Sequence, residues 1–415
     1  MIIKKFWLIL ITTVVMTGLL LFSVSASDVN VQKINNLNSN TIKGVDISSV
    51  VSEADSGVHY FDEAGHQESI FKILKSDGVN YIRVRVWNNP YTKSDNGYGG
   101  GNSDLEKAIL IGKQASKYGM KLLVDFHYSD FWADPSKQNA PKSWRDLSYA
   151  QKQKAVYNYT LDSLQKLKHA GVDIGMAQIG NETNNGIAGT TEWPEMAGIF
   201  NSGSAAVRNV DKNILVALHF TDIQKQGNDE WISKQLHDYN VDYDVFATSY
   251  YSYWHGSLSN LTQSLSDVSR AYDKKVMVAE TSYPYTYQDG DGFSNTINRN
   301  SNVTLQYPVS IQGQATALHD VFQAVANVGS AGLGVFYWEP AWVTVGPKSN
   351  LDNNRLLWEK FGSGWESTSA SEFDKDAEGN AGGSSWDNQA LFDFKGKALP
   401  SLKTFKYIDT GHTSK

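Results

Sequence analysis

Two glutamates that end apolar segments are the residues of this sequence best suited to catalysis. Glu182 closes the run QIGNE, and Glu280 closes the run VMVAE. An ionised carboxylate directly after an apolar strand is costly to bury, so we expect each side chain at the open end of its strand. Two carboxyl groups about 5–5.5 Å apart can hydrolyse a glycosidic bond, because one attacks the anomeric carbon while the other protonates the leaving oxygen. We therefore interpret Glu182 and Glu280 as a catalytic pair; the alternative is two structural glutamates held in salt bridges.

Eight β-like runs alternate with helical stretches and must position these side chains. Short β-rich runs predict strands at 44–48, 81–87, 121–127, 174–180, 214–219, 245–250, 275–280 and 332–338. Apolar residues at helical spacing predict helices at 68–76, 104–118, 149–170, 192–210, 231–239, 258–272 and 312–326, with 399–408 as an eighth.

This alternation predicts an α/β fold, a single (β/α)8 TIM barrel. An open doubly wound sheet would place a Gly-rich phosphate turn after its first strand, whereas Ser48-Ser49-Val50 stands there. Strands four and seven of a barrel face each other, so the two glutamates would meet over its mouth. Long connections at 88–103, 281–311 and 339–397 follow strands two, seven and eight. They would therefore lie on the C-terminal face, where barrel enzymes build their sites.

The composition excludes several classes of function. The 415-residue chain has a formal charge of −7, which disfavours nucleic acid and anionic membranes as partners. It contains no cysteine, so disulfide scaffolds, thiolate metal sites and a cysteine nucleophile are excluded. The HExxH, GxSxG, P-loop and dinucleotide-binding motifs are absent, and we expect no organic cofactor. Nothing in the sequence requires an oligomer, and we expect a monomer.

The first residues have the order of a secretory signal. Lys4 and Lys5 precede an apolar run over 6–22, and Val24-Ser25-Ala26 offers the small residues that a signal peptidase cleaves after. We predict a signal peptide at 1–26, a loose polar leader at 27–40 and a catalytic domain at 41–415. The mature protein would be secreted to the extracellular space without contacting a membrane. The alternative is a single membrane anchor, because the apolar run nearly reaches spanning length.

Several longer strings resemble those of a known family. They are GVDIS at 44–48, YIRVRVWN at 81–88, LVDFHYSDFW at 123–132, QNAPKSW at 138–144, QIGNETN at 178–184, AETSYP at 279–284 and FYWEPAW at 336–342. In this order they span most of the mature chain. The sequence resembles glycoside hydrolase family 53, the endo-β-1,4-galactanases, within a clan of retaining (β/α)8 enzymes whose acid/base and nucleophile follow strands four and seven.

The resemblance implies roles for individual residues. Glu182 would act as general acid and then as general base, and Glu280 would be the nucleophile. Asn181 would bond the sugar 2-hydroxyl, an interaction that strengthens in the transition state. Arg85, pointing inward from the second strand, would hold Glu280 in its charged form. Arg83 shares its face and is an alternative structural ion pair.

Aromatic and polar residues near the strand ends are the expected sugar-binding residues, since a pyranose packs its C–H face on an indole ring. Core packing is the alternative for each tryptophan. Trp338, at the end of strand eight, is the expected platform under the reacting sugar. Tyr251 is the expected partner of the nucleophile, with Tyr250 as the open alternative. The candidates are Asp46, Arg85, Asn88, His127, Asp130, Trp132, Asn181, Tyr251, Trp338, Trp342 and Trp365, with Trp87, His219 and Trp386 as further candidates.

A structural calcium site is expected in the connection after strand seven. Asp289, Asp291 and Asn295 are spaced to wrap one cation, with the carbonyl of Phe293 between them. The segment lacks the terminal glutamate of a calcium loop, so Ser385 and Asp387 in the last connection are candidates for the missing ligands. Bacterial members of the family that the sequence resembles carry such a calcium. The alternative is an ordinary Asp/Gly turn.

The function that these features and the resemblance predict is that of a secreted retaining endo-glycosidase. Its substrate would be a polysaccharide, β-1,4-galactan or type I arabinogalactan, and the choice of galactan depends on the resemblance. Another β-1,4-glycanase of the same clan, a mannanase or a cellulase, is the alternative among enzymes. A non-catalytic polysaccharide-binding barrel is the alternative outside them.

Overall fold

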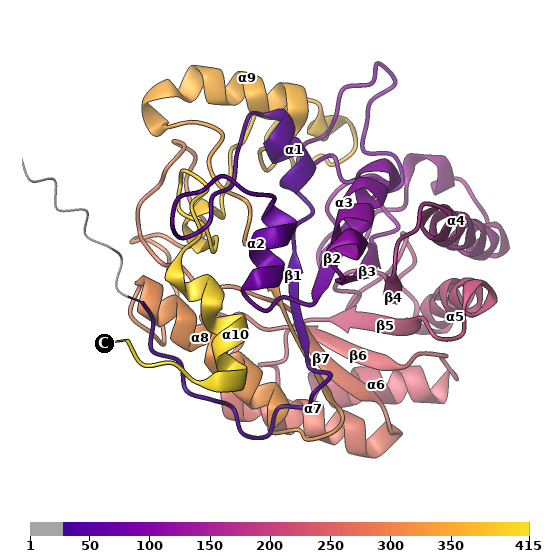
Figure 1. The fold of residues 1–415 in the computed structure, drawn as a ribbon. Helices are drawn as coiled ribbons and strands as arrows, with labels where there is room; N and C mark the ends of the chain where they lie inside the picture. Colours follow the sequence, from indigo (N-terminus) through magenta and orange to yellow (C-terminus); the bar gives the residue numbers. More distant parts are fainter. Residues whose placement is uncertain (1–27, 415) are drawn as a thin grey trace, which may run out of the picture.

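The computed structural model describes residues 28–414 (Figure 1). The predicted signal peptide lies outside the described residues. Within them, no helix combines the length and the apolar character that a membrane crossing requires.

Eight parallel strands close into a barrel in which each strand pairs with its neighbours in chain order. This confirms the predicted TIM barrel, and the observed strands match the predicted runs to within two residues at either end. The strands are β1 (Ile42–Asp46), β2 (Tyr81–Val86), β3 (Lys121–Phe126), β4 (Ile174–Ile179), β5 (Leu215–Phe220), β6 (Val245–Ser249), β7 (Lys275–Thr281) and β8 (Gly332–Trp338).

Helices surround the barrel, and all of the predicted ones are present (Figure 1). The two helices that the sequence pattern missed are α1 and α9. The helices are α1 (Val50–Asp55), α2 (Ile70–Ser76), α3 (Leu105–Lys117), α4 (Tyr149–His169), α5 (Trp193–Val210), α6 (Asn228–Asp238), α7 (Leu258–Tyr272), α8 (Ile311–Ala326), α9 (Leu351–Phe361) and α10 (Thr404–Thr410). Short 3-10 helices are η1 (Lys142–Trp144), η2 (Lys348–Asn350), η3 (Ala370–Glu372), η4 (Asp387–Gln389) and η5 (Pro400–Lys403).

Local sequence fixes the starts of several helices. Ser148 and Gln151 form a reciprocal capping box at the start of α4, and side chains of Asp104, Ser257 and Ser310 accept backbone N–H groups at the starts of α3, α7 and α8. Each satisfies a donor that the first helical turn would leave unpaired. The connections from the strand ends therefore enter their helices at defined residues.

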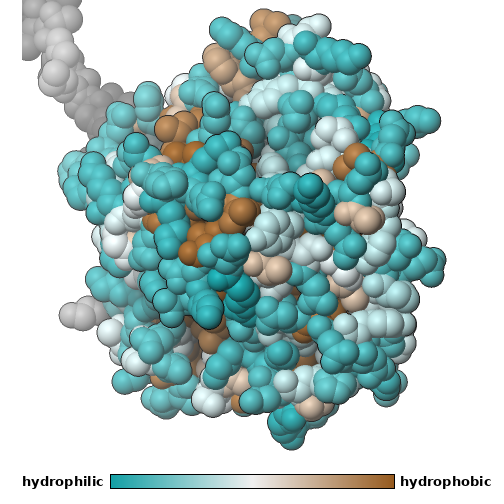
Figure 2. Space-filling model, turned by 90° about the vertical axis from the view of Figure 1, so that its right-hand side faces the viewer, coloured by the Kyte–Doolittle hydropathy of each residue, from teal (hydrophilic) through white to brown (hydrophobic). Residues whose placement is uncertain are grey.

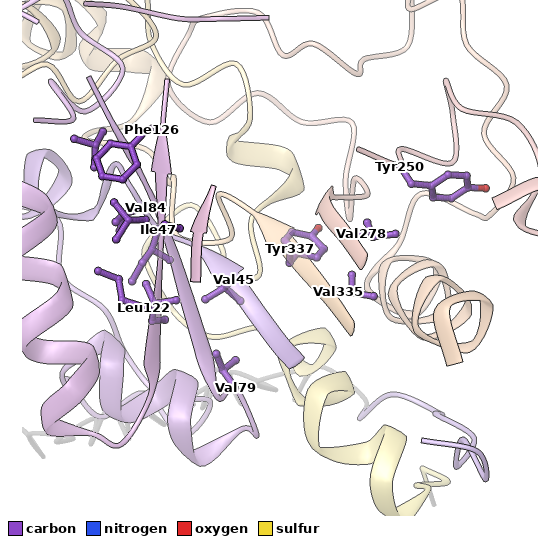
Figure 3. Close-up of a cluster of buried hydrophobic side chains, with 14 of the residues drawn as sticks. Val45, Ile47, Val79, Val84, Leu122, Phe126, Tyr250, Val278, Val335 and Tyr337 are labelled. Atoms are coloured by element: carbon purple, nitrogen blue, oxygen red, sulfur yellow. The ribbon is translucent and has the colours of Figure 1, made fainter. Parts of the chain in front are cut away.

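Alternation along the strands separates two apolar layers. Val45, Val84, Leu122 and Val278 point away from the barrel axis into the layer between sheet and helices, part of which is shown in Figure 3. A smaller cluster fills the barrel itself and includes Leu123, Met176, Met277 and Phe336. Because the side-chain period of a strand is two, Arg83 and Arg85 on either side of Val84 share the face toward the axis. The helical face shown in Figure 2, where α4 and α5 lie, is mostly hydrophilic, with apolar residues in small groups.

The segment before β1 differs from the loose leader predicted for it. Val29, Val31 and Ile34 are buried in the main core. Val31 pairs with His412 in an antiparallel bridge, and the Ile34 amide donates to the Ile408 carbonyl. Three apolar side chains at near-alternate positions were enough to dock this otherwise polar segment.

The three long connections, after β2, β7 and β8, meet over one side of the mouth. The Gly100 amide donates to the Gly364 carbonyl, joining the connections after β2 and β8. The amides of Tyr285 and Thr296, after β7, donate to the carbonyls of Asn388 and Ser385. These backbone hydrogen bonds join the three connections into one wall.

Candidate active site

A cleft of about 300 Å³ opens over the C-terminal ends of the strands, and both predicted catalytic glutamates line it. Glu182 follows β4 and Glu280 lies within β7. The other lining residues are Arg83, Arg85, Asp125, His127, Trp132, Ala133, Asp134, Asn181, Tyr251, Trp254, Thr296, Trp338, Trp365 and Trp386.

Glu280 is held by two partners. Arg83 Nη1 lies 2.8 Å from its Oε1, and the Tyr251 hydroxyl donates to its Oε2 at 3.0 Å. Burial raises the pKa of Glu280 above its ordinary value, and the charge of Arg83 and the Tyr251 hydrogen bond oppose that rise. The ion pair and the hydrogen bond favour the ionised form that a nucleophile requires. Tyr250 instead donates to the Gly256 carbonyl, so Tyr251 is the tyrosine that contacts Glu280.

The expectation that Arg85 holds Glu280 is wrong, because Arg83 does so. Arg85 donates to Glu339 Oε1 at 2.5 Å and to the Gly100 carbonyl. Both arginines point toward the barrel axis, but the strands of a barrel are staggered. Arg83 therefore lies at the same height in the barrel as Glu280 near the end of β7. Arg85 is two residues further along β2 and lies above that height.

Glu182 lies in a different electrostatic environment. Burial raises its pKa to about 8, and the charge of Glu280 adds to the rise. Its Oε1 accepts a 2.6 Å hydrogen bond from the Ser249 hydroxyl, which lies 2.9 Å from His219 Nε2. Burial lowers the pKa of His219 well below its ordinary value, so the ring is neutral. A carboxyl group with this pKa carries a proton at neutral pH, as a general acid must.

Backbone geometry also sets the position of Glu182. Glu182 has φ +45°, two residues after Gly180 at φ +91°, and Tyr128 and Glu339 have similarly positive φ just after the ends of β3 and β8. Residues other than glycine seldom adopt this left-handed conformation, and they persist there only when their surroundings hold them. The Glu182 amide lies 3.4 Å from His219 Nδ1, and the Gln138 side chain donates to the Asn181 carbonyl.

Beneath the cleft, Arg83 is the centre of a buried polar network. It lies 2.9 Å from Asp46 and 2.8 Å from Asp125, and it donates to the Asn181 side-chain oxygen at 2.8 Å. Asp46 is fully buried and does not line the cleft. Its observed contacts are charge pairing with Arg83 and hydrogen bonds from Ser48, which corrects the expectation that it binds sugar.

Three other expected sugar-binding residues lie away from the cleft. Asp130 accepts hydrogen bonds from the backbone of Asn89 and Lys142, so it ties two connections together. Asn88 is not among the lining residues. Trp342 is fully buried and stacks under Trp365, with 5.6 Å between ring centroids and 8° between planes. Their positions near strand ends were compatible with the mouth, but none of the three side chains lines the cleft.

Aromatic rings form the walls of the cleft. Trp132 stacks on Trp365 with centroids 4.6 Å apart, and Trp338 meets Trp386 edge to face at 4.8 Å. The Arg85 guanidinium lies 4.6 Å from the Trp132 ring centroid. Rings fixed by one another and by a buried cation present rigid faces for a sugar.

Sequence reasoning missed several residues at this site. Trp254, Asp134 and Thr296 line the cleft, Ser249 bonds Glu182, and Glu339 bonds Arg85. The position of Ser249 at the end of β6 was the available signal for one of them. Glu339 follows the platform candidate Trp338 directly, as Glu182 follows Asn181, and that similarity was a second signal.

The predicted calcium ligands converge where the connections after β7 and β8 meet. Carboxylate oxygens of Asp289, Asp291 and Asp387 all lie within 4.8 Å of one another. Oδ1 of Asn295 and Oδ1 of Asp387 are buried without a hydrogen-bond partner. Burial raises the pKa of Asp291 to about 7 and that of Asp387 well above its ordinary value. Clustered carboxylates and unpaired buried oxygens match the oxygen ligands of calcium.

Two further members of the predicted set flank this cluster. Ser385 is buried, and its carbonyl accepts the Thr296 amide. The Phe293 amide donates to Asp291 Oδ1, which places that residue within the loop. The ligand types thus fit a cation of the calcium class, while Lys348 pairs with Asp289 at the exposed edge.

Comparisons with known proteins identify the family to which this chain is similar. The model of glycosyl hydrolase family 53 matches residues 42–405. An endo-beta-1,4-galactanase of Bacillus subtilis is 56% identical over 391 residues, which cover 94% of this chain and 91% of that protein. An arabinogalactan endo-beta-1,4-galactanase of Cellvibrio japonicus is 37% identical, over 88% of this chain and 90% of that protein. Among solved structures, the Ignisphaera aggregans GH53 catalytic domain superposes with a TM-score of 0.82 at 37% identity, covering 92% of this chain and 99% of that chain.

The site predicts a measurable coupling between the two glutamates. We expect Glu280→Gln to lower the pKa of Glu182 from about 8, because the charge of Glu280 is one cause of the raised value. Titration of 13C-carboxyl-labelled glutamates by NMR would measure it. Glu192→Gln, at an exposed position, is the control and should leave the Glu182 titration unchanged. A Glu182 that titrates in the ordinary carboxylate range in the parent protein would contradict the assignment.

Proposed function

The chain belongs to glycosyl hydrolase family 53, and we propose that it hydrolyses β-1,4-galactosidic bonds in galactan and type I arabinogalactan, cutting within the chain by a retaining mechanism. The observation that carries the mechanism is the pair of carboxyl groups at one cleft with different charged and hydrogen-bonding partners. Glu280 is paired with Arg83 and Tyr251, whereas Glu182 has a pKa raised to about 8. Pairs of titratable groups separated in this way mark acid and nucleophile roles.

In the first step, a carboxylate oxygen of Glu280 attacks the anomeric carbon while Glu182 gives its proton to the glycosidic oxygen. The bond to the leaving sugar breaks, and a glycosyl ester of Glu280 forms. In the second step, Glu182, now a carboxylate, takes a proton from water, whose oxygen attacks the anomeric carbon. The ester bond breaks and both glutamates return to their starting states.

The neighbouring residues make these steps efficient by fixing geometry. Arg83 and Tyr251 orient both oxygens of Glu280, and Ser249 orients Glu182. Asn181, held by Arg83 and by the Ala133 carbonyl, is the side chain that we assign to the sugar 2-hydroxyl. Trp338 is assigned as the platform, and Trp132, Trp365, Trp254 and Trp386 as the walls that pack on further sugar units.

The choice of galactan rests on the relatives that are named endo-beta-1,4-galactanases. The catalytic pair alone is common to mannanases and cellulases of the same mechanism. The partly buried acid with its raised pKa, the buried nucleophile and the ion pair between Arg83 and Glu280 support an enzyme over a silent polysaccharide-binding barrel, because a binding protein has no use for a carboxyl group with a pKa of about 8.

We also assign calcium to Asp289, Asp291, Asn295 and Asp387, with Ser385 and the Phe293 carbonyl completing the set. The ion would be structural, since the two-carboxylate mechanism requires no metal. Bound there, it would neutralise buried carboxylates and fasten the connections after β7 and β8, both of which supply walls of the cleft.

Replacing either catalytic glutamate tests the mechanism. We expect Glu182→Gln and Glu280→Gln each to reduce kcat on β-1,4-galactan by at least about 10²–10⁴-fold, because proton transfer or covalent attack is lost. Release of reducing sugar measures the rate, and Glu106→Gln, an exposed change in α3, should match the parent. In the parent, kcat/KM should fall as the pH rises through about 8, where Glu182 loses its proton. Turnover that survives in either folded variant would refute the residue assignment, and equal hydrolysis of mannan or cellulose would refute the substrate.

Removing calcium tests the metal assignment. A chelator should lower the Tm, and added calcium should restore it, with about 2.7 kcal/mol of stabilisation at a hundredfold excess over Kd. Asp291→Asn should abolish this calcium dependence. Asp352→Asn, a fully exposed change in α9, should retain it. A Tm that does not respond to calcium in the parent protein would remove the ion from the assignment.

We propose that the protein is exported, cleaved after Ala26 and released as a monomer; Lys4, Lys5 and the apolar run support this. Mass spectrometry of protein secreted by a bacterial host should find Ser27 as the first residue. Changing Lys4 and Lys5 to Glu should reduce export, whereas Lys33→Glu should not. Cell-bound protein that retains Met1 would favour the membrane anchor, and sedimentation of the released protein checks the monomer.

A further inference from the structure

We propose that Trp193 and Trp231 form a second galactan-binding surface, outside the cleft, that holds another stretch of the polymer being cut. The proposal rests on the proposed function for the identity of the polymer. It concerns residues that take no part in the chemistry described above.

The two rings form an isolated aromatic pair at the protein surface. Trp231 is 50% exposed, although it lies in a helix that buries Ile232 and Leu236. Its ring meets that of Trp193 edge to face, with centroids 5.5 Å apart and planes at 88°. Trp193 packs against the core and so fixes the position of its neighbour. An indole that is half exposed, and whose orientation is fixed by a second indole, can bind a ligand on its free surface without first being ordered.

Topology places this pair on the rim of the mouth. Trp193 is the first residue of α5, which follows the connection that carries Glu182, and Trp231 lies in the first turn of α6. Helices of a (β/α)8 barrel begin at the end where the strands finish. The Asn184 side chain donates to the Thr221 carbonyl and accepts from the Thr221 amide, which joins the two connections before these helices.

Contacts through Thr221 link the connection before α6 to the aromatic wall of the cleft. Trp254, which is 40% exposed and lines the cleft, lies 6.5 Å from Trp386 between ring centroids. His255, next to Trp254, contacts the Thr221 side chain. Exposed indoles thus occur on both sides of the connection that contains Thr221, one in the cleft and the pair outside it.

The chemistry of the surroundings selects a neutral sugar polymer. Glu192, Glu195 and Glu230 are exposed beside the two rings, so an anionic polymer would be repelled. Their carboxylates can accept hydrogen bonds from sugar hydroxyls. β-Galactopyranose suits an indole because its axial 4-hydroxyl leaves the C–H groups at positions 3, 4 and 5 together on one face. A polymer long enough to fill the cleft and extend over the rim would engage both places, and the second contact would become intramolecular.

Kinetics on long and short substrates test the proposal. In Trp231→Ala we expect KM on polymeric β-1,4-galactan to rise about three- to tenfold with kcat unchanged, since avidity between linked sites is lost. Both constants on a galacto-oligosaccharide of about four units should stay at the parent values. Tyr239→Ala is the matched control, because it removes a 40% exposed aromatic ring at the opposite end of α6. Trp231→Phe should retain part of the effect.

A binding assay separates this surface from the cleft. In affinity electrophoresis through galactan with the Glu280→Gln background, saturating short oligosaccharide should leave a retardation that disappears on Trp231→Ala. An unchanged polymer KM, or equal retardation of the two proteins, would overturn the proposal. Sedimentation that shows a dimer abolished by Trp231→Ala would identify the surface as a contact between copies and also overturn it. If the parent cleaves no galactan but shows the Trp231-dependent retardation, the proposed function fails and the binding surface remains.

Discussion

A single buried guanidinium organises the catalytic end of this barrel. Arg83 lies at the centre of Asp46, Asp125 and Glu280, which come from β1, β3 and β7. None of these charges would be stable at this depth alone, because removing one partner from a buried pair leaves an uncompensated charge. The arrangement therefore fixes the relative positions of strands that are distant in the sequence. The position of Glu280 follows from that constraint.

The same constraint explains how two glutamates on one cleft differ in protonation. The positive charge of Arg83 lies beside Glu280, which also accepts a hydrogen bond from the Tyr251 hydroxyl. Glu182 is left with Ser249 as its hydrogen-bond partner and with the negative field of Glu280. The aromatic rings that line the cleft place both carboxyl groups in less polar surroundings than water, which strengthens both effects.

The barrel and the position of both glutamates at one cleft could be predicted from the sequence, because both follow strand periodicity. Apolar runs of five to seven residues ended by a carboxylate identify β4 and β7 without tertiary information. The partner of Glu280 could not be identified in this way, because Arg83 and Arg85 share a face and only the stagger between strands decides which of them reaches β7. The sequence likewise could not decide whether Tyr250 or Tyr251 contacts Glu280.

The residues whose roles were hardest to predict are those that contact distant parts of the chain. Asp46 and Asp130 follow or end strands as binding residues do, but their partners, Arg83 and the backbone of Lys142, come from elsewhere in the chain. The docked segment before β1 depends on α10 and on residues near His412, almost four hundred positions away. Local polarity alone cannot report such contacts.

The left-handed conformations of Glu182 and Glu339 have an implication for how this enzyme can change. Each departs from the preferred backbone by an amount that costs of order 1–3 kcal/mol. A glycine at position 182 would relax the chain there, but it would remove the carboxyl group of the proposed acid. At position 339 a glycine would also leave the buried Arg85 without its carboxylate partner, so nothing would be gained. Selection for stability and selection for turnover therefore act in opposite directions at Glu182.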